Sequence, residues 1–312
     1  MHCVNWGYKR IMSELQGYEY FTNNHNTYTV DIKTGEVFEM KTVTVPIGTK
    51  IYTPQQQKIY ADKIQTEQFK KQALSDLGHF CFIYGSNIYK EISPSSVTRL
   101  VYLCTFLKYD SDSLMKTRTT PIKLVDLPKI LNINKATASR FYNEVSPKFI
   151  FKDDDGNLHA NARLFQKGKL SNSFNEYPYR KFYINAVRQL YKETPTSKHR
   201  HLGYIFQLLP YINTEFNILC KDITVDNLKE IEPLTMKEFC ELIGFNISNL
   251  HRLYNEYRQI TFDVEGHKER FVSIVSDGAR TASAKIYINP HILYNGKHYK
   301  DIEVLGTFCK ID

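Results

Sequence analysis

Two stretches of this chain, PIKLVDLPKILNINKATASRFYNEV at residues 121–145 and PLTMKEFCELIGFNISNLHRLYNEY at residues 233–257, align with each other without a gap. Matching positions lie 112 residues apart. The identical pairs are Pro121/Pro233, Asn134/Asn246, Arg140/Arg252, Tyr142/Tyr254, Asn143/Asn255 and Glu144/Glu256. Most other pairs keep their apolar or polar character, so the match indicates a duplicated structural unit.

Flanking segments repeat in the same order. Upstream, LVYLCTFLKY at 100–109 matches LGYIFQLLPY at 202–211, and downstream KFYIN at 181–185 matches KIYIN at 285–289. Three matching blocks predict a unit of roughly 100 residues that occurs twice. We therefore expect an N-terminal region at 1–90, a first repeat domain at 91–192 and a second at 193–312.

Each unit has the pattern of a helix-turn-helix followed by a hairpin. Apolar residues at helical spacing predict a first helix of the motif in each copy. The turn is predicted at Asn132-Ile133-Asn134 and at Gly244-Phe245-Asn246, with the last asparagine as the cap of the next helix. Strand-like segments around turn residues predict the hairpins, formed by 149–152 with 157–165 and by 261–264 with 270–275. This order of elements is that of a winged helix.

The second helix of such a motif enters the major groove of DNA, where its exposed side chains meet base edges. The polar positions expected on that face are Lys135, Thr137, Ser139 and Arg140 in the first copy and Ser248, Asn249, His251 and Arg252 in the second. Arginine bonds guanine twice, asparagine does so to adenine, and serine or threonine binds bases or phosphates. An ordinary solvated helix face is the alternative, and the same arginine in both copies favours DNA binding.

Phosphate contacts are expected beside the recognition helices. The first hairpin tip, Asp153–Asp155, is acidic and would be repelled by phosphate. In the first unit we therefore expect these contacts in the stretch before the helix-turn-helix, at Lys116, Arg118 and Lys123, although a plain solvated loop would look the same. In the second unit the candidates are Lys268 in the hairpin and Arg280 in the loop that follows.

The string LNINKATASRFYNEV resembles the turn and recognition helix of bacterial helix-turn-helix regulators and replication proteins, in which Gly-Ile-Ser-x-x-Thr-Val-Ser-Arg is common. Here Asn132 replaces the usual glycine and Ala138 the usual valine. The chain also resembles Firmicute plasmid and phage replication proteins of the winged-helix kind, through DIKTGEV at 31–37 and IYINPHILYNG at 286–296. This resemblance implies an initiator with two tandem winged helices.

Composition is compatible with this interpretation. The chain has 312 residues, of which 42% are hydrophobic and 13% aromatic, so it can bury a substantial core. Its formal net charge of +8 suits nucleic acid or an anionic membrane, although the codon bias of an AT-rich genome gives the same charge. No apolar run reaches the ~20 residues of a membrane span. We expect a cytoplasmic protein with no membrane contact.

Nothing in the sequence indicates catalysis or a bound metal. The six cysteines are scattered and none forms a C-x-x-C pair, so neither a zinc site nor a disulfide framework is expected. The nucleophile, Walker, dinucleotide and metalloprotease strings are missing from the sequence. We therefore expect no enzyme activity, no metal and no cofactor.

The N-terminal region is expected to hold one β-hairpin at 27–45 and a helix that begins at Thr53-Pro54. An apolar stripe on this helix suits packing on the first unit, or a dimer or partner surface. Residues 168–180 are polar and predict a connection between the two units.

The sequence thus predicts an α+β, mostly helical chain with two tandem winged-helix domains and an N-terminal β-hairpin plus helix. The expected function is sequence-specific binding of double-stranded DNA in plasmid or phage replication initiation. The alternatives are a transcriptional regulator or repressor, and an interaction module for host polymerase or replication factors. Replication or transcription proteins are further expected partners, and the chain acts as a monomeric pseudo-dimer or as a homodimer.

Overall fold

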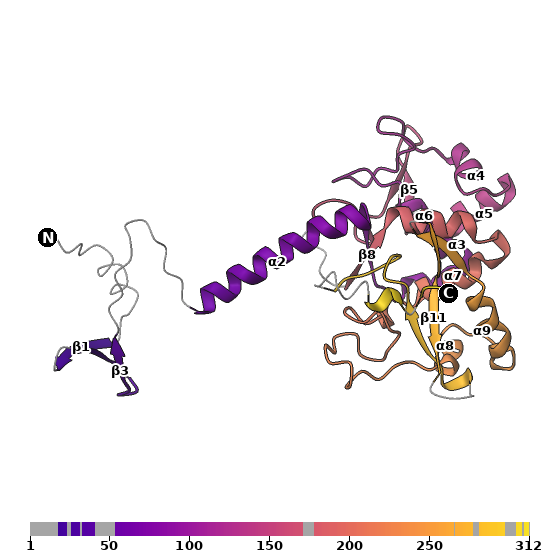
Figure 1. Ribbon diagram of the computed structural model, residues 1–312. Helices are drawn as coiled ribbons and strands as arrows, with labels where there is room; N and C mark the ends of the chain where they lie inside the picture. Colours follow the sequence, from indigo (N-terminus) through magenta and orange to yellow (C-terminus); the bar gives the residue numbers. More distant parts are fainter. Residues whose placement is uncertain are drawn as a thin grey trace. The chain divides into compact units, whose positions relative to one another are not determined.

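The protein is α+β, as predicted, with helices between small antiparallel sheets. A computed structural model describes residues 18–23, 26–31, 33–40, 54–170, 178–264, 266–276, 281–296, 304–307 and 309–311. The chain divides into two compact units, Met1–Tyr60 and Ala61–Asp312, and the second contains both copies of the repeat (Figure 1). The domain boundaries expected at residues 91 and 193 remain predictions.

The first unit contains a three-stranded antiparallel sheet in the order β1 (Tyr18–Asn23), β2 (Asn26–Asp31) and β3 (Val37–Met40). The predicted hairpin is formed by β2 and β3, while β1 was not predicted. Asp31 stabilises the turn because its Oδ1 accepts hydrogen bonds from the amides of Lys33 and Thr34, at 2.8 and 3.2 Å.

The predicted helix after this region is α2 (Pro54–Asp76), which begins at the proline as expected. The side chains of Ile59, Tyr60 and Ile64 on this helix are exposed.

The second unit begins with the first copy of the repeat. Its elements are β4 (Phe80–Tyr84), η1 (Asn87–Glu91), α3 (Pro94–Cys104), η2 (Leu124–Asp126), α4 (Leu127–Ile130), α5 (Lys135–Val145), β5 (Ile150–Lys152), β6 (Leu158–Ala160) and β7 (Phe165–Gln166). The helix α3 begins at a proline, and Ser93 caps it by accepting a hydrogen bond from the amide of Ser96.

The second copy follows in a similar order, with the longer helix α6 in the place of η1 and with one inserted hairpin. Its elements are β8 (Tyr179–Tyr183), α6 (Ile184–Glu193), η4 (Thr196–Lys198), α7 (His199–Gln207), η5 (Leu209–Tyr211), α8 (Met236–Leu242), η6 (Ile247–Asn249), α9 (Leu250–Arg258), β9 (Thr261–Val264), β10 (His267–Arg270), β11 (Val272–Val275), η7 (Thr281–Ser283) and β12 (Lys285–Ile288). The insertion is the β9–β10 hairpin, which separates α9 from β11.

Backbone hydrogen bonds recur in both copies and identify the equivalent strands. The amide of Leu114 donates to the carbonyl of Leu158 in β6, and the amide of Leu219 donates to the carbonyl of Ile286 in β12, both at 3.0 Å. The strand β12 therefore takes in the second copy the place of β6 in the first.

This equivalence corrects two predictions. The hairpin predicted from 261–264 and 270–275 is wrong, because Thr261–Val264 pairs with His267–Arg270 and β11 pairs with β12. The downstream match is also wrong, since 285–289 corresponds to 157–161 rather than to 181–185. Both mistakes have one cause: alternating apolar residues mark a strand but do not select its partner.

The upstream match is displaced by three residues. The bridge between Leu107 and Leu114 recurs as a bridge between Ile212 and Leu219, so α3 and α7 correspond at a spacing of 105 residues rather than 102. Three residues are close to one helical turn, so both alignments place apolar residues on the same face.

One asparagine closes the β-hairpin in each copy with the same hydrogen bonds. Asn161 donates its amide Nδ2 to the carbonyl of Lys148 at 2.8 Å, and Asn289 donates its Nδ2 to the carbonyl of Arg270 at 2.9 Å. Asn289 is fully buried and also donates to the carboxylate of Glu269 at 2.8 Å.

We expect Asn289→Ala to lower the free energy of unfolding by about 2–4 kcal/mol, because Glu269 would lose a partner for its buried charge. We expect Asn161→Ala to cost about 1 kcal/mol, since water replaces the lost bond at this half-buried site. Urea denaturation of the two variants, compared with the wild type, measures both values. Equal effects would contradict the assigned difference in burial.

The two copies meet across an approximate two-fold axis. In the sheet, β4 and β8 pair antiparallel with Phe82 opposite Lys181 at the centre of the register. To one side of this centre, Ile83 pairs with Phe165 of β7, and to the other, Phe182 bridges Leu293. Each central strand therefore pairs, on its other edge, with the segment that follows the β-hairpin of its own copy.

The helices α3 and α7 follow the same symmetry. Thr98 of α3 donates its hydroxyl to the carbonyl of His199, at 2.6 Å. At the equivalent position of α7, Gly203 lies so close to Pro94 that an added Cβ would be 1.8 Å from the carbonyl oxygen of Pro94. Each helix thus contacts the first turn of the other at the equivalent position. The two copies also share one hydrophobic core.

Candidate nucleic-acid interface

The turns and caps of the two predicted recognition helices form as expected. Asn134 accepts a hydrogen bond from the amide of Thr137 at 2.8 Å, and Asn246 accepts one from the amide of Ser248 at 2.9 Å. Both turns contain a residue with positive φ, 49° at Asn132 and 65° at Gly244. The second copy begins with the 3-10 turn η6, so its helix α9 starts only at Leu250.

Several identities between the copies have a structural reason. Glu144 binds the capping end of α3, where it accepts hydrogen bonds from Ser93 and Ser96. Glu256 lies at the corresponding end of α7 and pairs with Lys198 at 3.1 Å. The tyrosines shared by the copies are half-buried against the core.

Two other identities have no such reason. Arg140, Arg252, Asn143 and Asn255 are all exposed. The hydrogen bonds of the Arg140 side chain go to its own helix, at 3.4 Å to the carbonyl of Ala136 and 3.4 Å to the hydroxyl of Thr137. Within the described part of the chain, no side chain of these four bonds to another element.

The two asparagines were not among the predicted site residues. Each follows its arginine by three positions, so arginine and asparagine share one face of the helix. Their identity in both copies was the sequence signal, but identity alone did not separate them from the glutamates, which bind the first helix of each copy.

The remaining candidates on these helices are also accessible. Lys135, Ser139, Ser248, Asn249 and His251 are exposed, and Thr137 is half-buried. The imidazole of His251 stacks on Tyr254, with ring centroids 6.1 Å apart. In Figure 1, α5 and α9 both lie along the right-hand edge of the second unit.

The residues expected to contact phosphate differ in their exposure and in their partners. Lys123 is exposed and donates to the carbonyl of Asp155, at 3.1 Å. Lys116 is paired with Asp126, at 2.8 Å. Lys268 was predicted at the tip of a hairpin formed by 261–264 and 270–275. It lies instead in strand β10 of the inserted β9–β10 hairpin, where it pairs with Glu193. Arg280 lies outside the described residues.

The first hairpin tip contains a carboxylate, Asp153, whose ionised form is stabilised by its neighbours. The pKa of Asp153 is lowered to about 2, mainly by a hydrogen bond from Asn157 and further by His159. His159 lies between two carboxylates, 2.9 Å from Asp112 and 3.2 Å from Asp153. Burial alone would lower the pKa of His159, but hydrogen bonds to the two carboxylates raise it above its ordinary 6.5.

We expect the protonated His159 to stabilise this hairpin. Because the pKa of the folded state is raised, the stabilisation is fully present below pH 6.5 and is lost as the pH rises through the raised pKa. An NMR titration should give a pKa for His159 above 6.5 in the wild type and a lower one in Asp112→Asn. The control, Asp154→Asn, removes an exposed charge from the same tip, and a pKa unchanged in Asp112→Asn would contradict the assignment.

Metal and membrane sites were also sought among the described residues. That part of the chain holds no group of three His, Cys, Asp or Glu residues able to bind a metal ion. Its cysteines are buried free thiols, and burial raises the pKa of Cys220 and Cys240 to about 11. None of its helices combines the length and apolarity that crossing a bilayer requires.

Comparisons with family models, with curated proteins and with solved structures find no match to this chain.

Proposed function

We propose that this chain binds double-stranded DNA sequence-specifically through two winged-helix modules, and that it acts in the initiation of plasmid or phage replication. The observation that carries the proposal is the pair of identical arginines and asparagines exposed on α5 and α9. Core packing accounts for the shared tyrosines of these helices and polar contacts with the first helix of each copy account for the shared glutamates, whereas Arg140, Asn143 and their counterparts are available for base edges.

In this proposal each module consists of a first helix, a helix-turn-helix and a two-stranded wing. The first module uses α3, α4, α5 and the β5–β6 wing, and the second uses α7, α8, α9 and the β11–β12 wing. The recognition helices α5 and α9 enter successive major grooves, about one helical turn apart.

The approximate two-fold axis between the copies predicts the relative orientation of the two half-sites in the DNA. Helices related by a two-fold axis read half-sites in opposite directions, as dimeric helix-turn-helix proteins do on palindromes. We therefore expect a single chain to bind two inverted half-sites. A chain whose modules were related by translation would instead bind direct repeats.

The two half-sites are expected to differ in sequence. The arginine is shared, but Ser139 corresponds to His251 and Thr137 corresponds to Asn249. Asparagine in the second copy favours adenine where threonine in the first accepts several bases. The protein would therefore bind its site in one orientation only.

The role in replication rests on the resemblance of the strings at 31–37 and 286–296 to plasmid and phage replication proteins. An initiator binds sites that are repeated at an origin, whereas a regulator binds a site over a promoter. The genomic position of the recognised sequence separates these two roles.

Selection of bound sequences from random duplex DNA tests the proposal. A consensus with two inverted, unequal half-sites about one helical turn apart supports it. Half-sites in direct repeat would still support sequence-specific binding, but they would contradict the inverted arrangement inferred from the two-fold axis. No enrichment, with only weak and salt-sensitive binding, would refute DNA recognition and favour a protein-interaction module.

A further inference from the structure

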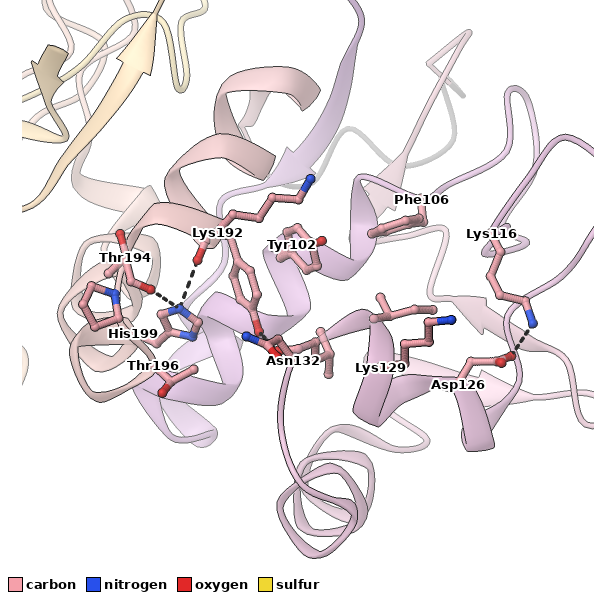
Figure 2. Close-up of a pocket in the computed structure, with 14 residues that line it drawn as sticks. Tyr102, Phe106, Lys116, Asp126, Lys129, Asn132, Lys192, Thr194, Thr196 and His199 are labelled. Atoms are coloured by element: carbon pink, nitrogen blue, oxygen red, sulfur yellow. Dashed lines mark hydrogen bonds and ion pairs between the residues drawn. The ribbon is translucent and has the colours of Figure 1, made fainter.

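A pocket of about 870 Å³ lies behind the helix-turn-helix of the first copy (Figure 2). One wall consists of α4 and the turn after it, and the other consists of the end of α6 and the segment that leads into α7. The residues lining it are Tyr102, Phe106, Lys116, Asp126, Lys129, Ile130, Leu131, Asn132, Tyr191, Lys192, Thr194, Pro195, Thr196 and His199.

The lining of the pocket carries a net positive charge. It contains three lysines and a single carboxylate, and that carboxylate, Asp126, is paired with Lys116. Lys129 and Lys192 are exposed and make no ion pair or side-chain hydrogen bond within the described part of the chain. Two cations without partners at the mouth of one pocket favour an anionic ligand.

The inner surface is aromatic and apolar. The rings of Tyr102 and Tyr191 stack with centroids 3.9 Å apart, and Phe106 packs edge-on against Tyr102 at 5.5 Å. Ile130 and Leu131 complete this surface. An inorganic anion alone would leave most of such a cavity unfilled, so the ligand should carry an organic part as well as its charge.

Two polar atoms in residues that line the pocket have no partner. His199 is almost fully buried, and its Nε2 lies 3.2 Å from the carbonyl of Tyr191 and 3.0 Å from that of Thr194. Since carbonyl oxygens only accept, Nε2 carries the proton and Nδ1 is left as an acceptor. Nδ1 and the hydroxyl of Thr194 are buried without a hydrogen bond.

The same histidine is held in its neutral form. Burial lowers the pKa of His199, and the nearby positive charge of Arg99 lowers it further.

We propose that this pocket binds an organic phosphate of nucleotide size, with its phosphates on Lys129 and Lys192 and its ring system against the aromatic surface. A volume of about 870 Å³ lies within the range of small-molecule sites. The site is distinct from the exposed faces of α5 and α9. It borders the turn that orients α5, because the hydroxyl of Tyr191 donates to the carbonyl of Leu131 at 2.8 Å.

Calorimetric titration of the full-length protein with ATP, GTP and inorganic pyrophosphate tests the site. We expect saturable binding of one ATP or GTP per chain, and binding of pyrophosphate at least tenfold weaker because it cannot use the aromatic surface. Pyrophosphate binding as tight as that of both nucleotides, or no binding of either nucleotide at millimolar concentration, would overturn the proposal.

Two variants separate a built pocket from general charge attraction. Lys129→Ala/Lys192→Ala removes the unpaired cations, and Thr196→Trp fills the mouth without a change in charge; each should weaken nucleotide binding at least tenfold. The charge-matched control is Lys229→Ala/Lys237→Ala, which changes exposed lysines that do not line the pocket and should leave binding unchanged.

Duplex DNA distinguishes this proposal from the one on DNA recognition. If the pocket lysine variant loses affinity for the selected duplex while no nucleotide binds the wild type, these lysines are phosphate contacts of the duplex. The nucleotide site would then be refuted and DNA recognition would stand. If a nucleotide binds the wild type but no DNA sequence is enriched, the nucleotide site stands and DNA recognition is refuted.

Discussion

Replacing both Arg140 and Arg252 by alanine is expected to weaken binding to the selected duplex by about 2–6 kcal/mol, which is about 30-fold or more. Each arginine forms two hydrogen bonds to a guanine in the proposed complex, and each loss costs about 1–3 kcal/mol. Both side chains are exposed, so the fold should be unaffected. Fluorescence anisotropy with labelled duplex, at fixed salt, measures the change.

The matched control is Arg163→Ala, which removes an exposed arginine from the segment after β6. It should change affinity for the selected duplex by less than about 0.5 kcal/mol. The thermal unfolding midpoints of both variants show whether they are folded. Wild-type affinity in a folded Arg140→Ala/Arg252→Ala variant would mean that α5 and α9 do not read DNA.

Replacing Gly203 by alanine is expected to lower the free energy of unfolding by about 3 kcal/mol. Within an ordinary helix this change would stabilise the protein by about 1 kcal/mol, because alanine is the better helix former. Here the added Cβ would stand 1.8 Å from the carbonyl oxygen of Pro94, so α3 and α7 must separate. Urea denaturation of the variant gives the value.

Thr98→Ser serves as the control at the symmetric contact. It keeps the hydroxyl that donates to His199 and should cost no more than about 1 kcal/mol. If Gly203→Ala were as stable as the wild type, the close approach of the two helices would be wrong. The variant should also lose affinity for two-part sites more than for single half-sites, since the spacing of α5 and α9 depends on this contact.

Much of the local structure could be read from the residues. The caps at Asn134 and Asn246, the turns beside them, and the proline that begins α2 follow from the chemistry of a few neighbouring residues. The duplication itself was also visible in the sequence, because residues such as Glu144 and Glu256 are retained to contact the same end of the first helix in each copy.

The candidate site was only partly predictable. Helical spacing identified Arg140 and Arg252 as exposed, but it could not divide the other identities into structural and functional ones. That division depends on which residues of α3 and α7 lie opposite each glutamate. Lys268 was misplaced for a similar reason, since its strand β10 belongs to an inserted hairpin and pairs with α6 through Glu193.

The local residue pattern thus determined where helices, turns and strands begin, and that one unit occurs twice. Tertiary structure alone decided which strands pair, that β12 and not β10 completes the second wing-like hairpin, and that an approximate two-fold axis relates the copies. The physical reason is the range of the interactions. Caps and helical faces depend on residues within one or two turns, whereas strand partners and the contact of Gly203 with Pro94 join segments far apart in the chain.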